Sequence, residues 1–166
     1  MATQFFLLLS LLIVATCSLL VAHAVSTPLP RIALKQIQSG RRVFVEADSG
    51  REIIFHGVNT IVKGIPYVPS TDVFDVDTSL TDEDHALLAD LGVNIYRLGA
   101  MWPGVEPERG QYNATYISEL NKIVAAAGNH GIYTILDMHQ DVFSERYCGE
   151  GVPYWAAITS VDNDRK

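Results

Sequence analysis

Segments with strand and helix character alternate along this chain, and this alternation limits the folds that are open to it. Apolar runs predict strands, and 3.6-residue periodicity between capping and terminating residues predicts helices. The predicted order is strand 53–58, helix 81–91, strand 93–98, helix 114–130 and strand 132–136. Such an order predicts a parallel sheet covered by helices. We therefore expect an α/β fold.

The loop after the first of these strands distinguishes the two α/β folds that begin in this way. An open, doubly wound sheet often carries a glycine-rich phosphate-binding turn at that point. Here Gly57-Val58-Asn59 leads into a long loop with no G-x-G-x-x-G pattern. The sequence therefore favours the N-terminal portion, about three βα units, of a (β/α)8 TIM barrel.

Two segments precede this predicted domain at 41–166. Residues 1–24 have no charged side chain, a long apolar run and small residues before the end, which is typical of a secretory signal peptide cleaved after Ala24. An uncleaved membrane anchor is the alternative, because the run approaches the roughly 18–20 residues that span a bilayer. Residues 25–40 are interpreted as a lead-in. A β-hairpin is then predicted, with strands at 43–45 and 53–58.

The charge and the predicted leader restrict the partners and the compartment. The chain has a net charge of −7 and no basic run, which argues against a nucleic-acid partner. The leader predicts a secreted, extracellular or lysosomal protein. The sequon at Asn113 is a candidate glycosylation site. Cys17 lies in the leader, so Cys148 is a lone cysteine, either with a free thiol or with a partner outside this sequence.

Polar side chains follow the predicted strands of the sheet. Functional residues of a barrel project from the carboxyl ends of its strands. Asn59 and then Lys63 follow the first strand, Arg97 lies in the second, and Asp137 and His139 follow the third. Because side chains alternate along an extended segment, Asp137 and His139 should share a face. We therefore expect a polar pocket at this end of the sheet.

Each candidate also has a purely structural explanation. Arg97 could pair with a carboxylate on a neighbouring strand, and His139 could be a hydrogen-bonded loop residue. Lys63 could be a solvated surface lysine. Trp102 could stack on a sugar ring or simply close the rim of the barrel. Glu106 is expected to be exposed in its loop.

Four motifs carry a resemblance to a known family. They are His-Gly-Val-Asn at 56–59, Gly-Val-Asn-Ile-Tyr-Arg-Leu-Gly at 92–99, Leu-Asp-Met-His-Gln-Asp at 136–141 and Cys-Gly-Glu-Gly-Val-Pro-Tyr-Trp-Ala at 148–156. Together they resemble the opening third of an endoglycoceramidase, a member of glycoside hydrolase family 5. The similarity covers about residues 41–157. The third and fourth motifs are the specific ones, whereas His-Gly-Val-Asn is short and common.

This resemblance implies a retaining enzyme that cleaves the β-glycosidic bond between an oligosaccharide and ceramide in glycosphingolipids. It implies no cofactor and no metal, and contact with a membrane only through the lipid substrate. An arginine like Arg97 would keep the nucleophilic glutamate ionised. Residues matching Lys63, Asp137 and His139 would bind the sugar. Further candidates in the same pocket are Asn59, Trp102 and Gln140.

The resemblance places both catalytic residues outside this chain. Retaining hydrolysis needs two carboxyl groups about 5–5.5 Å apart. In the family these are glutamates after barrel strands four and seven, the first in an Asn-Glu-Pro motif that this chain lacks. Glu150 lies in the loop after the third strand and is not assigned to catalysis. Residues 25–166 are also shorter than the about 250 residues of a barrel. We therefore expect a truncated and inactive N-terminal fragment.

Two other functions remain open at this point. Asp137, His139 and Asp141 could bind a divalent metal in a metal-dependent hydrolase, because imidazole and carboxylate groups suit several such ions. A short secreted protein that binds glycan without catalysis is the second alternative. It predicts a chain of this length that folds cooperatively by itself.

Overall fold

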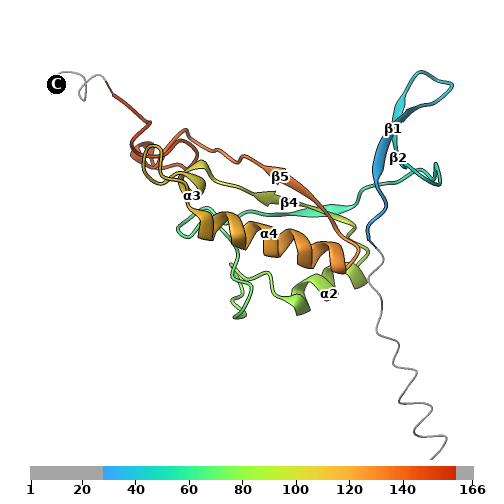
Figure 1. Cartoon of the computed structure of the whole chain (residues 1–166), viewed down its shortest axis with the longest axis horizontal. Coiled ribbons are helices and arrows are strands. Elements are labelled where there is room, and N and C mark those ends of the chain that lie inside the picture. Colours follow the sequence, from blue (N-terminus) through green and yellow to red (C-terminus); the bar gives the residue numbers. More distant parts are fainter. Residues whose placement is uncertain (1–27, 160–166) are drawn as a thin grey trace, which may run out of the picture.

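The structure, a computed structural model, describes residues 28–159 and contains two sheets, the second of which is covered by helices (Figure 1). The first sheet is an antiparallel hairpin of β1 and β2, and the second is a parallel sheet in the order β3-β4-β5. The strands are β1 (Ile32–Gln36), β2 (Arg42–Glu46), β3 (Gly57–Thr60), β4 (Ile95–Gly99) and β5 (Tyr133–Asp137). The helices are α2 (Asp82–Asp90), α3 (Trp102–Val105), α4 (Ala114–Asn129) and the short 3-10 helix η1 (Glu145–Tyr147).

The parallel sheet confirms the predicted α/β arrangement. Register pairs Asn59 with Arg97 and Arg97 with Ile135, so these three side chains lie on one face of the sheet. The other face carries Tyr96 and Leu98, which are 1% and 0% exposed. Helices α2 and α4 lie along that buried face (Figure 1). The sheet therefore has a helix-covered face and a face that carries Arg97.

The hairpin differs from the predicted one. Strand β2 agrees with the predicted strand at 43–45, but its partner is β1, which lies within the segment interpreted as a lead-in. The predicted partner 53–58 contributes one backbone hydrogen bond to β2, from Ile53 N to Phe44 O, and Glu52 just before it forms an isolated bridge with Val45. Strand β1 has a weak signal because most of its residues remain partly or fully exposed. The predicted signal peptide, 1–24, lies outside the described residues.

Capping residues fix the helix ends near the predicted positions. Thr81 and Asp84 form a capping box at the start of α2, and Gly92 follows its end with a φ of 79°. Asn113 caps α4 by accepting a hydrogen bond from Tyr116 N. Helix α3 lies in a segment predicted as loop, because its four residues are too few to show periodicity.

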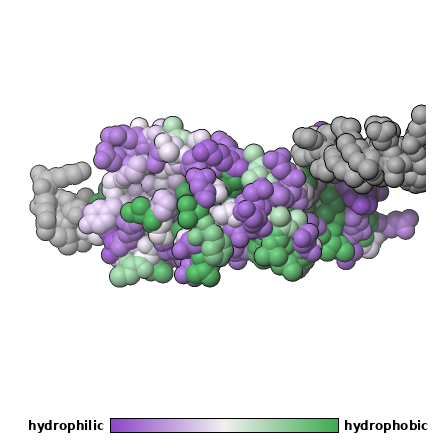
Figure 2. Space-filling view, turned by 90° about the horizontal axis from the view of Figure 1, so that it is seen from below, coloured by the Kyte–Doolittle hydropathy of each residue, from purple (hydrophilic) through white to green (hydrophobic). Residues whose placement is uncertain are grey.

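The core lies between the sheet and these helices. On α4 the buried positions are Tyr116, Leu120, Ile123 and Ala127, whereas Ile117 and Val124 are each 40% exposed. Apolar side chains also occur in separate patches on the outer surface of the helical layer (Figure 2). Among the described residues, no helix has both the length and the hydropathy of a membrane span.

A buried polar network connects both helices to the sheet. His85 of α2 is 1% exposed, and its Nδ1 lies 2.8 Å from the Thr81 carbonyl oxygen. Its Nε2 lies 3.2 Å from the hydroxyl of Tyr96, which also lies 3.2 Å from the Ile123 carbonyl oxygen. Burial lowers the pKa of His85, although the Thr81 carbonyl opposes this shift. Nearby His130 lowers the pKa further, while Asp82 and Asp84 raise it.

This network predicts a pH-dependent component of stability. Because the pKa of His85 is lower in the folded state, the unfolded chain takes up the proton first as pH falls below about 6.5. The free energy of unfolding should therefore decrease from there through the lower pKa of the folded state. Urea unfolding of the wild type and of His85→Gln across this range measures the component, which the variant should lack. His56→Gln, at an exposed position, is the control. An unchanged pH slope in His85→Gln would contradict the assignment.

Candidate functional site

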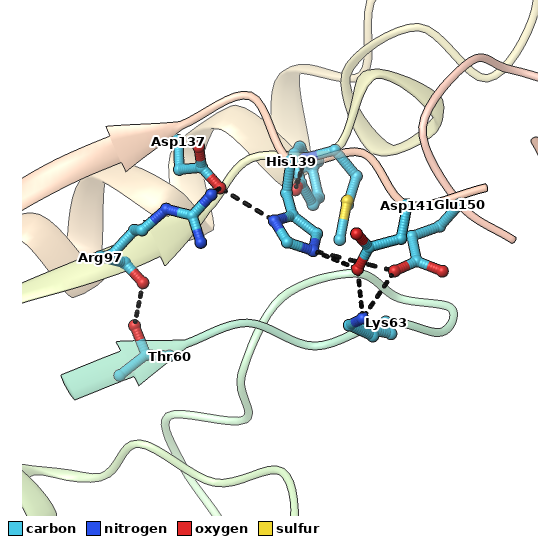
Figure 3. Close-up of polar contacts among 9 residues, drawn as sticks. Thr60, Lys63, Arg97, Asp137, His139, Asp141 and Glu150 are labelled. Carbon is cyan, nitrogen blue, oxygen red and sulfur yellow. Dashed lines mark hydrogen bonds and ion pairs between the residues drawn. The ribbon is translucent and has the colours of Figure 1, made fainter. Parts of the chain in front are cut away.

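Strands β4 and β5 bring the predicted arginine and aspartate together. Asp137, the last residue of β5, lies opposite Gly99 in the register, on the face of the sheet that also carries Arg97. Arg97 Nη2 lies 2.8 Å from Asp137 Oδ2 (Figure 3). The arginine thus makes the inter-strand ion pair that its structural explanation predicts. It remains 42% exposed, so it can also contact a further group.

His139 lies between two carboxylates. Its Nδ1 is 3.0 Å from Asp137 Oδ2, and its Nε2 is 3.0 Å from Asp141 Oδ2. A carboxylate only accepts hydrogen bonds, so both contacts are hydrogen bonds at once only when both ring nitrogens carry a proton. The side chain is 9% exposed. Asp137 and His139 therefore share a face, as the alternation predicts.

Lys63 joins this cluster from the loop after β3. Its ammonium group contacts Asp141 and lies 3.2 Å from Glu150 Oε1 (Figure 3). Asp141 and then Glu150 raise the pKa of Lys63. In return, Lys63 and His139 lower the pKa of Asp141. Lys63 is therefore an ion-paired member of the cluster and not an isolated surface lysine.

Glu150 is the member of the cluster that sequence reasoning missed. An antiparallel bridge connects Asp141 to Glu150 through two backbone hydrogen bonds of 2.8 Å. This bridge turns the Glu150 side chain toward Lys63 and His139, and leaves it 10% exposed. Gly149 is required beside the bridge, because a Cβ there would lie 2.3 Å from the Asp141 carbonyl oxygen. The Gly-Glu-Gly pattern was the available signal, since close backbone approach favours glycine.

The three weaker candidates occupy different places. Asn59 is exposed and lines a hollow of about 280 Å³ with Arg97 and Ile135. Gln140 is exposed, and its side chain lies so close to Gly151 that a Cβ there would be 2.3 Å from Gln140 Cγ. The structure thus places Asn59 beside Arg97. Gln140 lies in the sequence between His139, which contacts Asp137, and Asp141, which contacts Lys63.

Trp102 lies away from the polar cluster. Its ring contacts that of Trp155 edge to face, with centroids 5.9 Å apart, and lines an apolar groove with Met138. Its Nε1 donates to Glu106 Oε2 at 2.8 Å. This hydrogen bond has the largest effect in lowering the pKa of Glu106, and a second one from Gly110 N lowers that pKa further. Glu106 was expected to be exposed but is half-buried, because it holds Trp102 in place.

The geometry disfavours the metal site that the sequence left open. Asp137 and Asp141 lie on opposite ring nitrogens of His139, so these three residues do not converge on one ion. Ligand atoms of His139, Asp141 and Glu150 do lie within 4.8 Å of one another. The ammonium of Lys63 contacts both of those carboxylates and supplies the positive charge there. The cluster is therefore better described as an ion-paired polar site.

Two further candidates remain predictions. Asn113 uses its Oδ1 to cap α4 and is half-buried. A glycan would attach to its nitrogen, so the cap and the sequon are compatible. Cys148 is exposed and carries a free thiol among the described residues.

Charged side chains at the carboxyl ends of parallel strands are typical of α/β enzymes, among them those built on βα barrels. A family model described as cellulase (glycosyl hydrolase family 5) matches residues 49–164. The chain therefore belongs to glycosyl hydrolase family 5, a family of O-glycosyl hydrolases.

Similar proteins confirm the resemblance to endoglycoceramidases. The endoglycoceramidase of Cyanea nozakii is 51% identical over 115 residues, which are 69% of this chain and 23% of that protein. A crystal structure of an endogalactoceramidase has 27% identity and a TM-score of 0.60, covering 79% of this chain and 31% of its own. Endo-glycoceramidase II from Rhodococcus sp., in complex with ganglioside GM3, has 31% identity and a TM-score of 0.52. The match covers 67% of this chain and 26% of that chain. This chain thus spans less than a quarter of the curated relative.

The bridge between Asp141 and Glu150 predicts that a single methyl group added at Gly149 lowers the stability of the protein. Gly149→Ala should break the bridge, because the added Cβ meets backbone atoms that cannot rotate away. We expect a loss of about 1–3 kcal/mol in the free energy of unfolding, as for other overpacked sites. Gly128→Ala in α4 is the matched control, since nothing lies within 4 Å of its Cβ. This control should be neutral or slightly stabilising. Equal stability of both variants in urea unfolding would refute the proposed requirement for Gly149.

Proposed function

We propose that residues 25–166 form the sugar-binding portion of a secreted, retaining glycoside hydrolase that acts on glycosphingolipids. The bond cleaved would join the oligosaccharide to ceramide. The observation that carries this proposal is the continuous set of contacts from Arg97 through Asp137 and His139 to Lys63, at the carboxyl ends of the strands. The endoglycoceramidase relatives support the substrate class.

This cluster has the chemistry that sugar hydroxyls require. Hydroxyl groups both donate and accept, and the cluster offers carboxylate acceptors beside an ammonium donor. Lys63 and Asp141 are about half exposed, whereas Asp137 and His139 are largely buried. Because the buried members are held by one another, they can present a fixed pattern that rewards a matching hydroxyl. The most accessible groups, Lys63 and Asp141, would be reached first by a glycan.

Arg97 suits the role that the family resemblance implies. Its guanidinium carries five N–H donors in a fixed plane, so pairing with Asp137 leaves donors for a second carboxylate. It lines the hollow with Asn59 and Ile135, on the face of the sheet that would be the barrel interior. A nucleophilic glutamate placed there would be kept ionised by the arginine.

Asp141 is unsuited to act as the acid of a retaining pair. A general acid needs a raised pKa so that it holds a proton near neutral pH. The pKa of Asp141 is instead lowered by Lys63 and His139. In line with the family resemblance, we place the catalytic glutamates in parts of the protein other than residues 25–166. Localisation in an extracellular or lysosomal compartment would follow from the predicted leader.

Cleavage of a ganglioside tests this proposal in the natural protein that contains this chain. Free oligosaccharide and ceramide should appear together, and Lys63→Met should lower kcat/KM roughly tenfold or more, because a charge-assisted hydrogen bond is lost. Lys122→Met, which removes a lysine that pairs with Glu119 on the surface of α4, is the control. An unchanged kcat/KM in Lys63→Met would remove Lys63 from the binding site. Absence of ganglioside cleavage by the wild type would refute the substrate class.

The separate chain of residues 25–166 gives a second test. It should release no oligosaccharide above a heat-killed control, because the pair of glutamates would be missing. Chromatography of the released glycan measures this. Turnover by the separate chain would show that the catalytic pair lies within it.

A further inference from the structure

We propose that Glu150 is a positioning residue, whose buried carboxylate holds the ammonium of Lys63 and the imidazole of His139 where a sugar is bound. This inference rests on the proposed function, in which Lys63 and His139 contact the glycan. Glu150 itself need not touch the sugar.

The difference in burial between the two carboxylates on Lys63 supports this role. Asp141 is 46% exposed and Lys63 is 55% exposed, so water screens their ion pair. Glu150 is 10% exposed, and its Oε1, which lies 3.2 Å from Lys63 Nζ, is excluded from solvent. A charge pair is less screened at a buried carboxylate than at an exposed one. Glu150 is therefore the buried carboxylate that holds the Lys63 ammonium in place, whereas the Asp141 carboxylate is exposed to solvent.

Anchoring matters because lysine is flexible. Its four-carbon side chain loses rotamer entropy when it is held in one conformation. If the free protein already holds the ammonium group, the sugar does not bear this cost when it binds. An ammonium group has three N–H donors. Asp141 engages one of them, and Glu150 Oε1 lies 3.2 Å away as an ion-pair partner, which leaves donors for a sugar hydroxyl.

Glu150 also reaches the second sugar-binding candidate. Its Oε1 lies 3.8 Å from His139 Nε2, the nitrogen that contacts Asp141. Glu150 thus limits the position of the imidazole ring that Asp137 and Asp141 contact. Removal of Glu150 would loosen the positions of both Lys63 and His139.

The backbone around Glu150 is strained, which is typical of functional loops. Four non-glycine residues have positive φ in the described part of the chain: Tyr67, Val142, Phe143 and Cys148. Three of them lie in the loop between Asp141 and Glu150, and the fourth lies in the loop that carries Lys63. Such conformations are unfavourable for non-glycine residues and persist where surrounding contacts enforce them.

A contact between these two loops enforces their arrangement. The Tyr67 hydroxyl donates to Glu145, in the 3-10 helix of the second loop. The Asp141–Glu150 bridge closes the same loop at its base. Both strained segments are thus fastened so that Lys63 and Glu150 meet.

The first experiment compares Glu150→Gln and Glu150→Asp with the wild type, in the natural protein that contains this chain. The glutamine keeps the shape of the side chain and the aspartate keeps its charge. A positioning role through charge predicts that KM for a ganglioside rises roughly tenfold in Glu150→Gln and less in Glu150→Asp, with kcat little changed. A role in packing alone predicts the reverse order of the two variants, and this result would overturn the proposal.

A second measurement follows Lys63 directly and needs no ligand. Competitive acetylation of the folded protein, read by peptide mass spectrometry, compares the reactivity of Lys63 with that of Lys35. In Glu150→Gln the pKa of Lys63 should fall, so its acetylation rate at about pH 8 should rise severalfold. Glu119→Gln, which removes the partner of Lys122, is the matched control and should affect Lys122 alone. An unchanged rate at Lys63 in Glu150→Gln would refute the contact.

A double-mutant cycle separates failure of this inference from failure of the proposed function. In a Lys63→Met background, Glu150→Gln should have a much smaller effect on KM, because the group that it positions is gone. The same fold-change in both backgrounds would overturn the positioning role. If Lys63→Met itself leaves ganglioside cleavage unchanged while acetylation still responds to Glu150→Gln, the contact stands and the sugar-binding role fails.

Discussion

Asp137 Oδ2 accepts contacts from both Arg97 and His139, and the arrangement of the site depends on this shared oxygen. The contact to Arg97 crosses from β5 to β4, whereas the contact to His139 runs along the chain beyond the end of β5. The contact to His139 therefore fixes the orientation of the segment that follows β5. His139, held in this way, meets Asp141, which in turn contacts Lys63 from the loop after β3. Three consecutive strand ends are thus connected through Asp137, His139 and Asp141.

The buried side of the sheet gives this carboxylate a firm support. Tyr96 and Leu98 alternate with Arg97 along β4, so the packing that fixes them also fixes the direction of the arginine. Tyr116 of α4 performs a similar task for the loops, because its hydroxyl accepts from Met101 N and donates to Tyr67 O. Tyr67 lies in the loop of Lys63. The core and the site are therefore connected by direct hydrogen bonds from α4.

Sequence patterns were sufficient wherever structure depends on neighbouring residues. The helix boundaries near residues 81–91 and 114–130 and the alternation of Asp137 with His139 are all local, and each was predicted. Features that depend on distant pairing were missed: β1 was interpreted as a lead-in because its partner decides its conformation. Glu150 was missed for a related reason. Its burial arises from a bridge across a strained loop. The glycines beside it indicate a close backbone approach, but they do not show that Asp141 is the partner.

The pairing within the cluster also explains why charged groups can be buried there without a metal ion. A buried charge is stable only when it is paired and hydrogen-bonded. Arg97 balances Asp137, and Lys63 contacts both Asp141 and Glu150. Arg97 and Lys63 each keep hydrogen-bond donors beyond those that these carboxylates engage. A metal ion at the position of Lys63 would attract carboxylates as ligands, whereas a lysine keeps a directional N–H for a hydroxyl. The cluster therefore combines charge balance with unused donors, which is the combination that recognition of an uncharged sugar requires.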